Sequence, residues 1–318
     1  MRHLFTLMAI FMIAISAQAQ VTVGTRMFGS FQDFDKGEYK IIKGKTTVFV
    51  VDDLDVSEFE NMIKDVWTYN KYIVVDRANY DEEAYKTEQY APFVVEGFNK
   101  TVTSSSGMVS EYVYIYYHYY YYTFKKRKKK TKVKKRTIAG VFLSGSPETI
   151  WATLASKKFG DLDEGYTNYG LGYLKNYLQK INSEFEDEGY SFAYAEDYDK
   201  KKLKALKNKT LYVPDFIKNK YHAWMMSSKG GTEEERDDKD GLFKKYDHPY
   251  EWVSKDALNE KILNATEDFY YLMYVRVNSQ KILAVMNGYT GEMIYRDYQT
   301  LSYNIKRKDI SRIGSKVK

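Results

Sequence analysis

The chain has 318 residues, 32 tyrosines, no cysteine and a formal net charge of +6 at pH 7. Without cysteine the sequence excludes disulfides, thiol nucleophiles and thiolate metal sites, and it excludes a lipoprotein, whose lipid needs a cysteine directly after the signal sequence. The positive charge is concentrated: ten basic residues lie between Lys125 and Arg136, and the rest of the chain is mildly acidic.

The N-terminal segment has the three parts of a secretory signal peptide. Arg2 and His3 precede an apolar run over residues 4–16, and Ala17-Gln18-Ala19 supplies the small residues of a cleavage site. The apolar run is shorter than the roughly 20 residues that a membrane-spanning helix needs. We therefore expect residues 1–19 to be removed and the protein to be exported to the periplasm or the cell surface.

A first α/β unit is predicted over residues 20–155. Apolar runs and helical periodicity indicate, in chain order, a strand, a helix, a strand, a helical stretch and a strand at residues 47–52, 56–68, 72–77, 80–89 and 91–98. Ser57, with Glu60 three residues later, is expected to cap the first helix. Asp52, at the end of the first strand, is expected to cap the helix that follows it.

The most unusual stretch begins with a strand of tyrosines and ends in the basic run. Residues 112–122 contain eight tyrosines in an alternating pattern, and residues 137–143 form an apolar return strand. Together they predict a long hairpin with a cationic tip. The candidate partner-binding residues are Tyr120, Tyr122, Lys125, Lys126, Arg127, Lys128, Lys129, Lys130, Lys132, Lys134, Lys135 and Arg136.

Two interpretations of this hairpin stay open. Clustered Lys and Arg attract polyanions through long-range, salt-sensitive forces, and neighbouring tyrosines can stack on sugar rings. An anionic glycan, lipopolysaccharide or a membrane surface would fit. Nucleic acid is disfavoured, because no aromatic residue lies inside the basic run and because the chain carries an export signal. Alternatively, the charges keep an edge strand from pairing with other chains.

A second unit, residues 156–318, repeats the pattern. A helix over residues 169–188 is expected to pack one unit on the other. Strands are expected at residues 210–215, 250–255 and 268–277, a helix at 257–265, a polar loop at 227–240 and a final hairpin at 281–286 and 292–298. The predicted fold class is α/β (α+β), with two similar βαβαβ-plus-hairpin lobes joined by a packed helix.

Enzyme motifs are missing from the sequence. It contains neither Gly-x-Ser-x-Gly nor His-Glu-x-x-His, and Gly44-Lys45-Thr46 lacks the earlier glycine of a phosphate loop. The strand at residues 210–215 matches the strand at 47–52, and Asp215 ends it as Asp52 ends the other. Asp215 is likewise expected to cap the helix that follows. We therefore predict no catalytic residue, cofactor or metal.

Residues 45–90 show a local resemblance. The segment Val74-Val75-Asp76-Arg77-Ala78-Asn79-Tyr80-Asp81-Glu82 resembles the curli-secretion lipoprotein family and its relatives that are similar to the N-terminal domain of TolB, in which a strand ending in Val-x-Arg is followed by a helix. The Ala-Gln-Ala-Gln ending of the signal peptide is similar to that of uncharacterised secreted proteins of Bacteroidota. This resemblance implies a compartment and no activity.

Three functions are compatible with these observations. The first is a non-enzymatic envelope protein that binds an anionic or carbohydrate partner through its basic hairpin. The second is an assembly or secretion accessory protein that forms a homo-oligomer through exposed strand edges and the tyrosine-rich strand. The third is a hydrolase without a recognisable motif, which would need a polar cleft with two suitably separated carboxylates.

Overall fold

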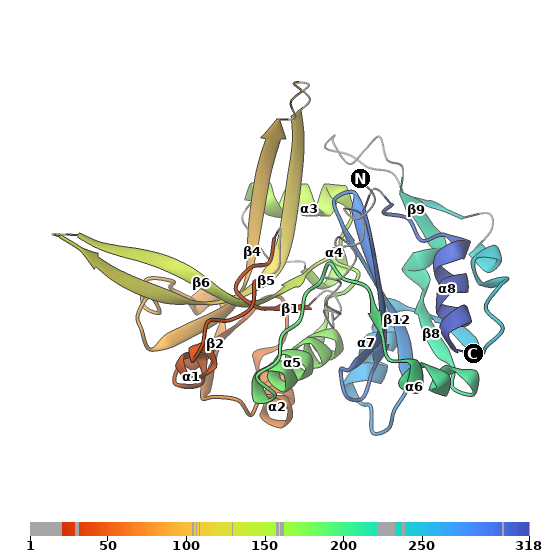
Figure 1. Cartoon of the computed structure of the whole chain (residues 1–318), viewed down its shortest axis with the longest axis horizontal. Coiled ribbons are helices and arrows are strands. Elements are labelled where there is room, and N and C mark those ends of the chain that lie inside the picture. The colour runs from red at the N-terminus through yellow and green to blue at the C-terminus, as the bar shows by residue number, and fades with distance from the viewer. Residues whose placement is uncertain are drawn as a thin grey trace, which may run out of the picture.

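The computed structural model describes residues 21–28, 32–103, 105, 107, 109–128, 130–156, 159, 162–221, 233–236, 239–300 and 302–317. Over these ranges the chain combines helices with two six-stranded sheets, so the expected mixed α/β class is confirmed (Figure 1). None of the helices in the described ranges is long and apolar enough to cross a membrane. The predicted signal peptide lies outside the described residues.

The first sheet has the strand order β1-β6-β5-β4-β2-β3. Its strands are β1 (Val21–Val23), β2 (Thr46–Val51), β3 (Tyr72–Asp76), β4 (Tyr90–Thr103), β5 (Val109–Arg127) and β6 (Lys130–Phe142). β2 runs parallel to β3 and to β4, whereas the pairs β4–β5, β5–β6 and β1–β6 are antiparallel. β5 is long enough to form two hairpins, which project from the body in different directions (Figure 1).

The second sheet has the order β11-β8-β12-β13-β14-β7. Its strands are β7 (Asp197–Tyr198), β8 (Leu211–Pro214), β11 (Tyr250–Val253), β12 (Tyr270–Val277), β13 (Gln280–Asn287) and β14 (Met293–Gln299). β8 is parallel to β11 and β12, and the remaining pairs are antiparallel. β2 and β8, β3 and β11, and β4 and β12 therefore occupy equivalent positions in the two orders.

Helix α5 (Leu171–Glu186) confirms the helix expected between the units. It packs against α2 (Val56–Val66) and α7 (Lys255–Leu263). Alternation along β12 divides its side chains: Tyr271 and Met273 join the core that also contains the helix-facing side of the first sheet, and Leu272 joins a second core behind the sheet. One continuous apolar core thus connects the two sheets through α5.

The remaining elements lie around the two sheets. They are α1 (Glu38–Lys43), α3 (Pro147–Ser156), α4 (Leu162–Gly165), α6 (Lys200–Leu203), α8 (Arg307–Val317) and the 3-10 turns η1 (Arg77–Asn79), η2 (Lys204–Lys207), η3 (Asp215–Lys218) and η5 (Lys239–Phe243). α6 and α8 lie beside β14 and η2, over the second core. The short strands β9 (Asn219–Tyr221) and β10 (Glu233–Glu235) pair with each other in a separate ribbon.

Three local expectations are corrected. Asp55, not Ser57, caps α2, because its carboxylate accepts a hydrogen bond from the amide of Glu58 at 2.9 Å. Residues 80–89 form turns and bends after η1 instead of a helix. The polar loop at residues 227–240 contributes strand β10 and part of η5, and its other residues, apart from Arg236, lie outside the described ranges.

Candidate functional site

The basic run forms the outer part of the β5–β6 hairpin, as expected. The two strands stay in register to the tip, where Lys125 lies opposite Lys132, Thr123 opposite Lys134, and Arg127 opposite Lys130. Partners directly opposite each other share one face of a hairpin, and positions two residues apart share it too. We call the register positions of Lys125, Arg127, Lys130, Lys132 and Lys134 the cationic face.

The lysines of the cationic face are exposed. Lys125, Lys130, Lys132 and Lys134 are all exposed, and in the described part of the chain none of the four has an acidic side chain within ion-pair distance. Lys126 and Lys128 are also exposed, whereas the side chain of Arg127 and the whole of Lys129 lie outside the described residues. Because Lys125 and Lys132 are directly opposite like charges, the bare hairpin carries a repulsion that an anion would relieve.

Lys135 and Arg136 do not belong to this free surface. The ammonium of Lys135 lies 3.1 Å from Glu82 and 2.6 Å from Glu96. The Arg136 guanidinium binds Glu38 through two hydrogen bonds of 2.7 Å. Because their charges are already balanced inside the protein, we correct their assignment: these two residues anchor the root of the hairpin.

Tyr120 and Tyr122 are buried, so the expectation that they stack on a partner is wrong. They retain 0% and 4% exposure, in a cluster with Val48, Val50 and Val94 on the face of the sheet opposite α2. The ammonium of Lys135 covers the Tyr120 ring at 4.3 Å. The segment after β3 closes this second face, which explains why both sides of the tyrosine-rich strand are core.

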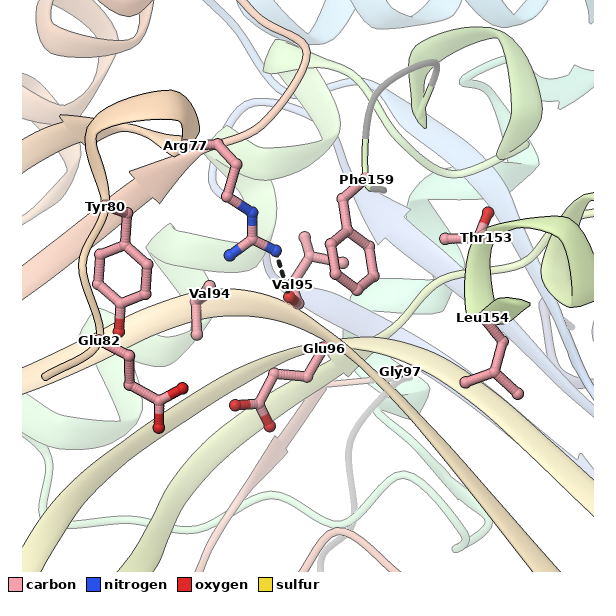
Figure 2. Close-up of a pocket in the computed structure, with 10 residues that line it drawn as sticks. All are labelled: Arg77, Tyr80, Glu82, Val94, Val95, Glu96, Gly97, Thr153, Leu154 and Phe159. Atoms are coloured by element: carbon pink, nitrogen blue, oxygen red, sulfur yellow. Dashed lines mark hydrogen bonds between the residues drawn. The ribbon is translucent and has the colours of Figure 1, made fainter. Parts of the chain in front are cut away.

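A pocket of about 420 Å³ opens next to this cluster of valines and tyrosines, over β4. Its apolar walls come from Tyr80, Val94, Leu154 and Phe159, and its polar groups from Arg77, Glu82 and Glu96. Figure 2 shows the Arg77 guanidinium directed into the pocket between the Phe159 ring and the carbonyl oxygen of Val95, to which it donates a 2.7 Å hydrogen bond. The pocket therefore combines one arginine with two carboxylates.

The two carboxylates are tied into a network that starts on the hairpin. Glu96 accepts from Lys135 and lies 2.8 Å from His118, while Tyr122 donates a 2.5 Å hydrogen bond to Glu82. Burial favours the neutral form of Glu96, but the hydrogen bonds and charges of His118 and Lys135 outweigh it and hold its pKa at about 2. Burial opposes ionisation of Glu82 too, yet Tyr122 and Lys135 lower its pKa. Both groups are anions at neutral pH.

Asp52 is not a helix cap, which corrects that expectation. Its side chain is fully buried, and its carboxylate lies 2.7 Å from Nε of Arg77. Burial raises the pKa of Asp52 to about 7, because the opposing attraction of Arg77 is weaker than the loss of hydration. Asp215 does not cap either: it is the first residue of η3, which has no side-chain cap.

This arrangement bears on the hydrolase alternative. Acid–base hydrolysis needs two carboxyl groups whose pKa values are separated, so that one carries a proton. In the pocket the pKa values of both glutamates are lowered, and Asp52, which pairs with Arg77, is not among the lining residues. The described residues contain no group of three His, Asp or Glu side chains placed to hold a metal ion.

The sequence contains one signal for this network. Glu96 interrupts the apolar run of β4 at a position where alternation predicts a neighbour of Val94 on the same face. A charged residue inside such a run needs a partner, which predicts an ion pair or hydrogen bond for Glu96.

Comparison of the chain with protein-family models, with curated proteins and with solved structures gave no match. The local resemblance of residues 45–90 thus remains an expectation.

Proposed function

We propose that the protein is an exported, non-enzymatic envelope protein that binds an anionic glycan, lipopolysaccharide or an anionic membrane surface with the cationic face of its β5–β6 hairpin. The observation that supports this is the alignment of four exposed lysines, Lys125, Lys130, Lys132 and Lys134, on one side of a projecting ribbon. No acidic side chain in the described ranges neutralises them.

The geometry of the ribbon suits an extended polyanion. Successive cationic positions along one strand are separated by roughly 7 Å, and the partner strand lies about 5 Å away. Such a ladder presents charge at regular intervals without a deep cleft. The interaction would act through long-range attraction and would weaken as salt screens it.

The test compares the mature protein with two variants of equal charge. In one, Lys125, Lys130, Lys132 and Lys134 become Gln. In the other, the exposed lysines Lys200, Lys201, Lys204 and Lys207 of the second unit become Gln. Binding to dextran sulfate and to lipopolysaccharide is measured by calorimetry from about 0.05 M to about 0.5 M salt.

We expect the hairpin variant to lose affinity on the order of a hundredfold or more, since each lysine near an anionic surface contributes ~1 kcal/mol. The variant in the second unit should bind almost as wild type. Equal affinity of the two variants, or binding that salt leaves unchanged, would contradict the proposal.

A second function, an oligomeric assembly or secretion accessory role, is favoured by one observation. The β4–β5 hairpin exposes apolar side chains near its tip, with Val109 63% and Val102 38% accessible. Such a hairpin offers a surface to another strand. Sedimentation over a wide concentration range tests this: self-association that disappears on Val102→Ser/Val109→Ser would support it, and a monomer throughout would overturn it.

We also propose that the two sheets arose by duplication, as lobes of residues 20–155 and 156–318, the second including α5. Two features of the sheets support this. Three parallel strands (β3-β2-β4 and β11-β8-β12) are followed in each sheet by three antiparallel strands (β5-β6-β1 and β13-β14-β7). In each sheet the strand that comes first in the chain, β1 or β7, is short and lies at the far edge. The test is to build a sequence profile for each half separately, from whatever relatives each half has. Profiles that converge on each other would support duplication, and profiles that stay distinct would contradict it.

A further inference from the structure

The foot of the cationic face opens into a second cavity, on the side of the sheet that α1 covers. This hollow has a volume of about 490 Å³, within the range of small-ligand sites. Among the residues around it are Arg26, Lys36, Lys125, Lys134 and Arg136, together with Asp35 and Glu38. It is continuous with the ladder of lysines, because Lys125 and Lys134 belong to both.

The hollow is lined by more cationic than acidic side chains. Arg136 binds both carboxylates, at 2.9 Å to Asp35 and at 2.7 Å to Glu38. Burial raises the pKa of Glu38, but the hydrogen bond and charge of Arg136 outweigh this and lower it, so the carboxylate stays ionised beside the arginine. Of the five cationic side chains around the hollow, Arg136 is therefore the one that pairs with Asp35 and Glu38.

The other four cations differ from Arg136 in this respect. Arg26, Lys36, Lys125 and Lys134 form no ion pair within the described part of the chain. Arg136 itself is held in place by its two carboxylates, and its side chain is still 26% accessible. Among the described residues, the hollow thus has one unpaired guanidinium, that of Arg26, beside three unpaired ammonium groups. Such an arrangement binds tetrahedral oxyanions, since the arginine supplies directed donors and the lysines supply charge.

We propose that this hollow binds a phosphate or sulfate ester on a sugar unit of the polyanion. This inference rests on the proposed function and names its ligand: the chain of the polyanion lies along the ribbon, and one ester group enters the hollow. The concave shape favours a discrete sugar ester over a flat lipid surface, whose headgroups would meet the ribbon but not its root.

The experiment uses glucose 6-phosphate, glucose 6-sulfate and glucuronate as small probes, dextran sulfate as the polymer, and phosphatidylglycerol vesicles as the lipid source. The mature protein is compared with a hollow variant, Arg26→Gln/Lys36→Gln, and with a ladder variant, Lys130→Gln/Lys132→Gln. Both remove two exposed positive charges, and neither changes a residue that forms an ion pair in the described structure.

We expect the two glucose esters to bind the mature protein, and glucuronate to bind more weakly. The hollow variant should weaken ester binding about tenfold, while the ladder variant should change it little. Both variants should weaken binding of dextran sulfate.

Two other results would overturn the inference and leave the proposed function standing. In the first, the ladder variant weakens binding of dextran sulfate, but no glucose ester binds the mature protein. In the second, the ladder variant weakens binding of the vesicles, and again no glucose ester binds. Failure of the proposed function looks different, because then neither variant would change binding of dextran sulfate. An ester that binds equally to the hollow variant would also overturn the inference.

Discussion

Lys135 is the second-last residue of the basic run and lies on β6, yet its ammonium is 2.6 Å from the carboxylate of Glu96 on β4, two strands away in the sheet. Glu96 lines the pocket of Arg77, so the pair joins one charge of the hairpin to the wall of that pocket. The root of the hairpin is thus held by ion pairs, while its outer lysines remain in solvent. This division separates residues that stabilise the hairpin from residues that are free to meet the proposed partner.

Replacing Glu96 by Gln should destabilise the protein at neutral pH. The folded pKa of Glu96, about 2, is below its ordinary 4.5, so its stabilising contribution is complete above about pH 4.5 and is lost as the pH falls toward 2. Allowing for partial exposure, we expect a loss of about 2 kcal/mol at pH 7. Urea unfolding at pH 7 and near pH 2.5 measures it: the gap between wild type and variant must shrink in acid.

Asp52 is expected to act in the opposite direction and in a different pH window. Its folded pKa of about 7 exceeds the ordinary 3.8, so the folded state keeps a proton that the unfolded chain releases. Stability should therefore fall as the pH rises from about 4 to 7, by an amount on the order of 4 kcal/mol from this group. Asp52→Asn should remove that slope.

The matched control for Asp52 is Asp65→Asn, which changes an exposed carboxylate on α2. Unfolding free energies of the three proteins are measured across pH 4 to 8 in the same buffer series. If Asp52→Asn retains the wild-type slope between pH 4 and 7, burial does not control this carboxyl and our account of it is wrong.

The hairpin itself could be predicted from the sequence, but its internal partners could not. Alternation and the basic run are local signals, and they indicated the strand, its faces and the projecting tip. The contact between Lys135 and Glu96 depends on the register of three strands, and β5 and β6 shift register between Tyr119 and Tyr120. A register change of one residue moves side chains to the opposite face, so no local pattern could assign Lys135.

Burial of the tyrosines was missed for a related reason. The face that holds Tyr120 is covered by Tyr80, Tyr85 and Tyr90, which come from the turns after β3 and from the start of β4. A polar segment with no regular structure gives no sequence signal that it covers a sheet. The predicted helix at residues 80–89 was wrong at the same place, because this segment reaches across the sheet in turns.

Tyr120 should therefore behave as a core residue. Tyr120→Ala removes a fully buried ring and leaves a cavity, with an expected cost of about 3–5 kcal/mol. Tyr120→Phe keeps the ring and should change stability by less than about 1 kcal/mol. Thermal and urea unfolding give these values, and dextran sulfate binding of the folded Phe variant should equal that of wild type. Weaker binding by that variant would return Tyr120 to the partner surface.

The contact between α5 and α7 sets how closely the two sheets approach, and Gly172 controls it. A Cβ atom at Gly172 would lie 2.1 Å from the backbone oxygen of Asn259 on α7, so an alanine there must push the two helices apart. We expect Gly172→Ala to cost about 2 kcal/mol or more, measured by urea unfolding.

Gly44→Ala is the control for this effect, because Gly44 has φ −78° and its nearest atoms lie at 3.6 Å. That change should be neutral or slightly stabilising, by roughly 0.5 kcal/mol, since it restricts the unfolded chain. If the two glycine variants unfold alike, α5 and α7 are not in backbone contact. If Gly172→Ala alone is destabilised, α5 holds the second sheet through this contact, and the continuous core across both sheets depends on a residue without a side chain.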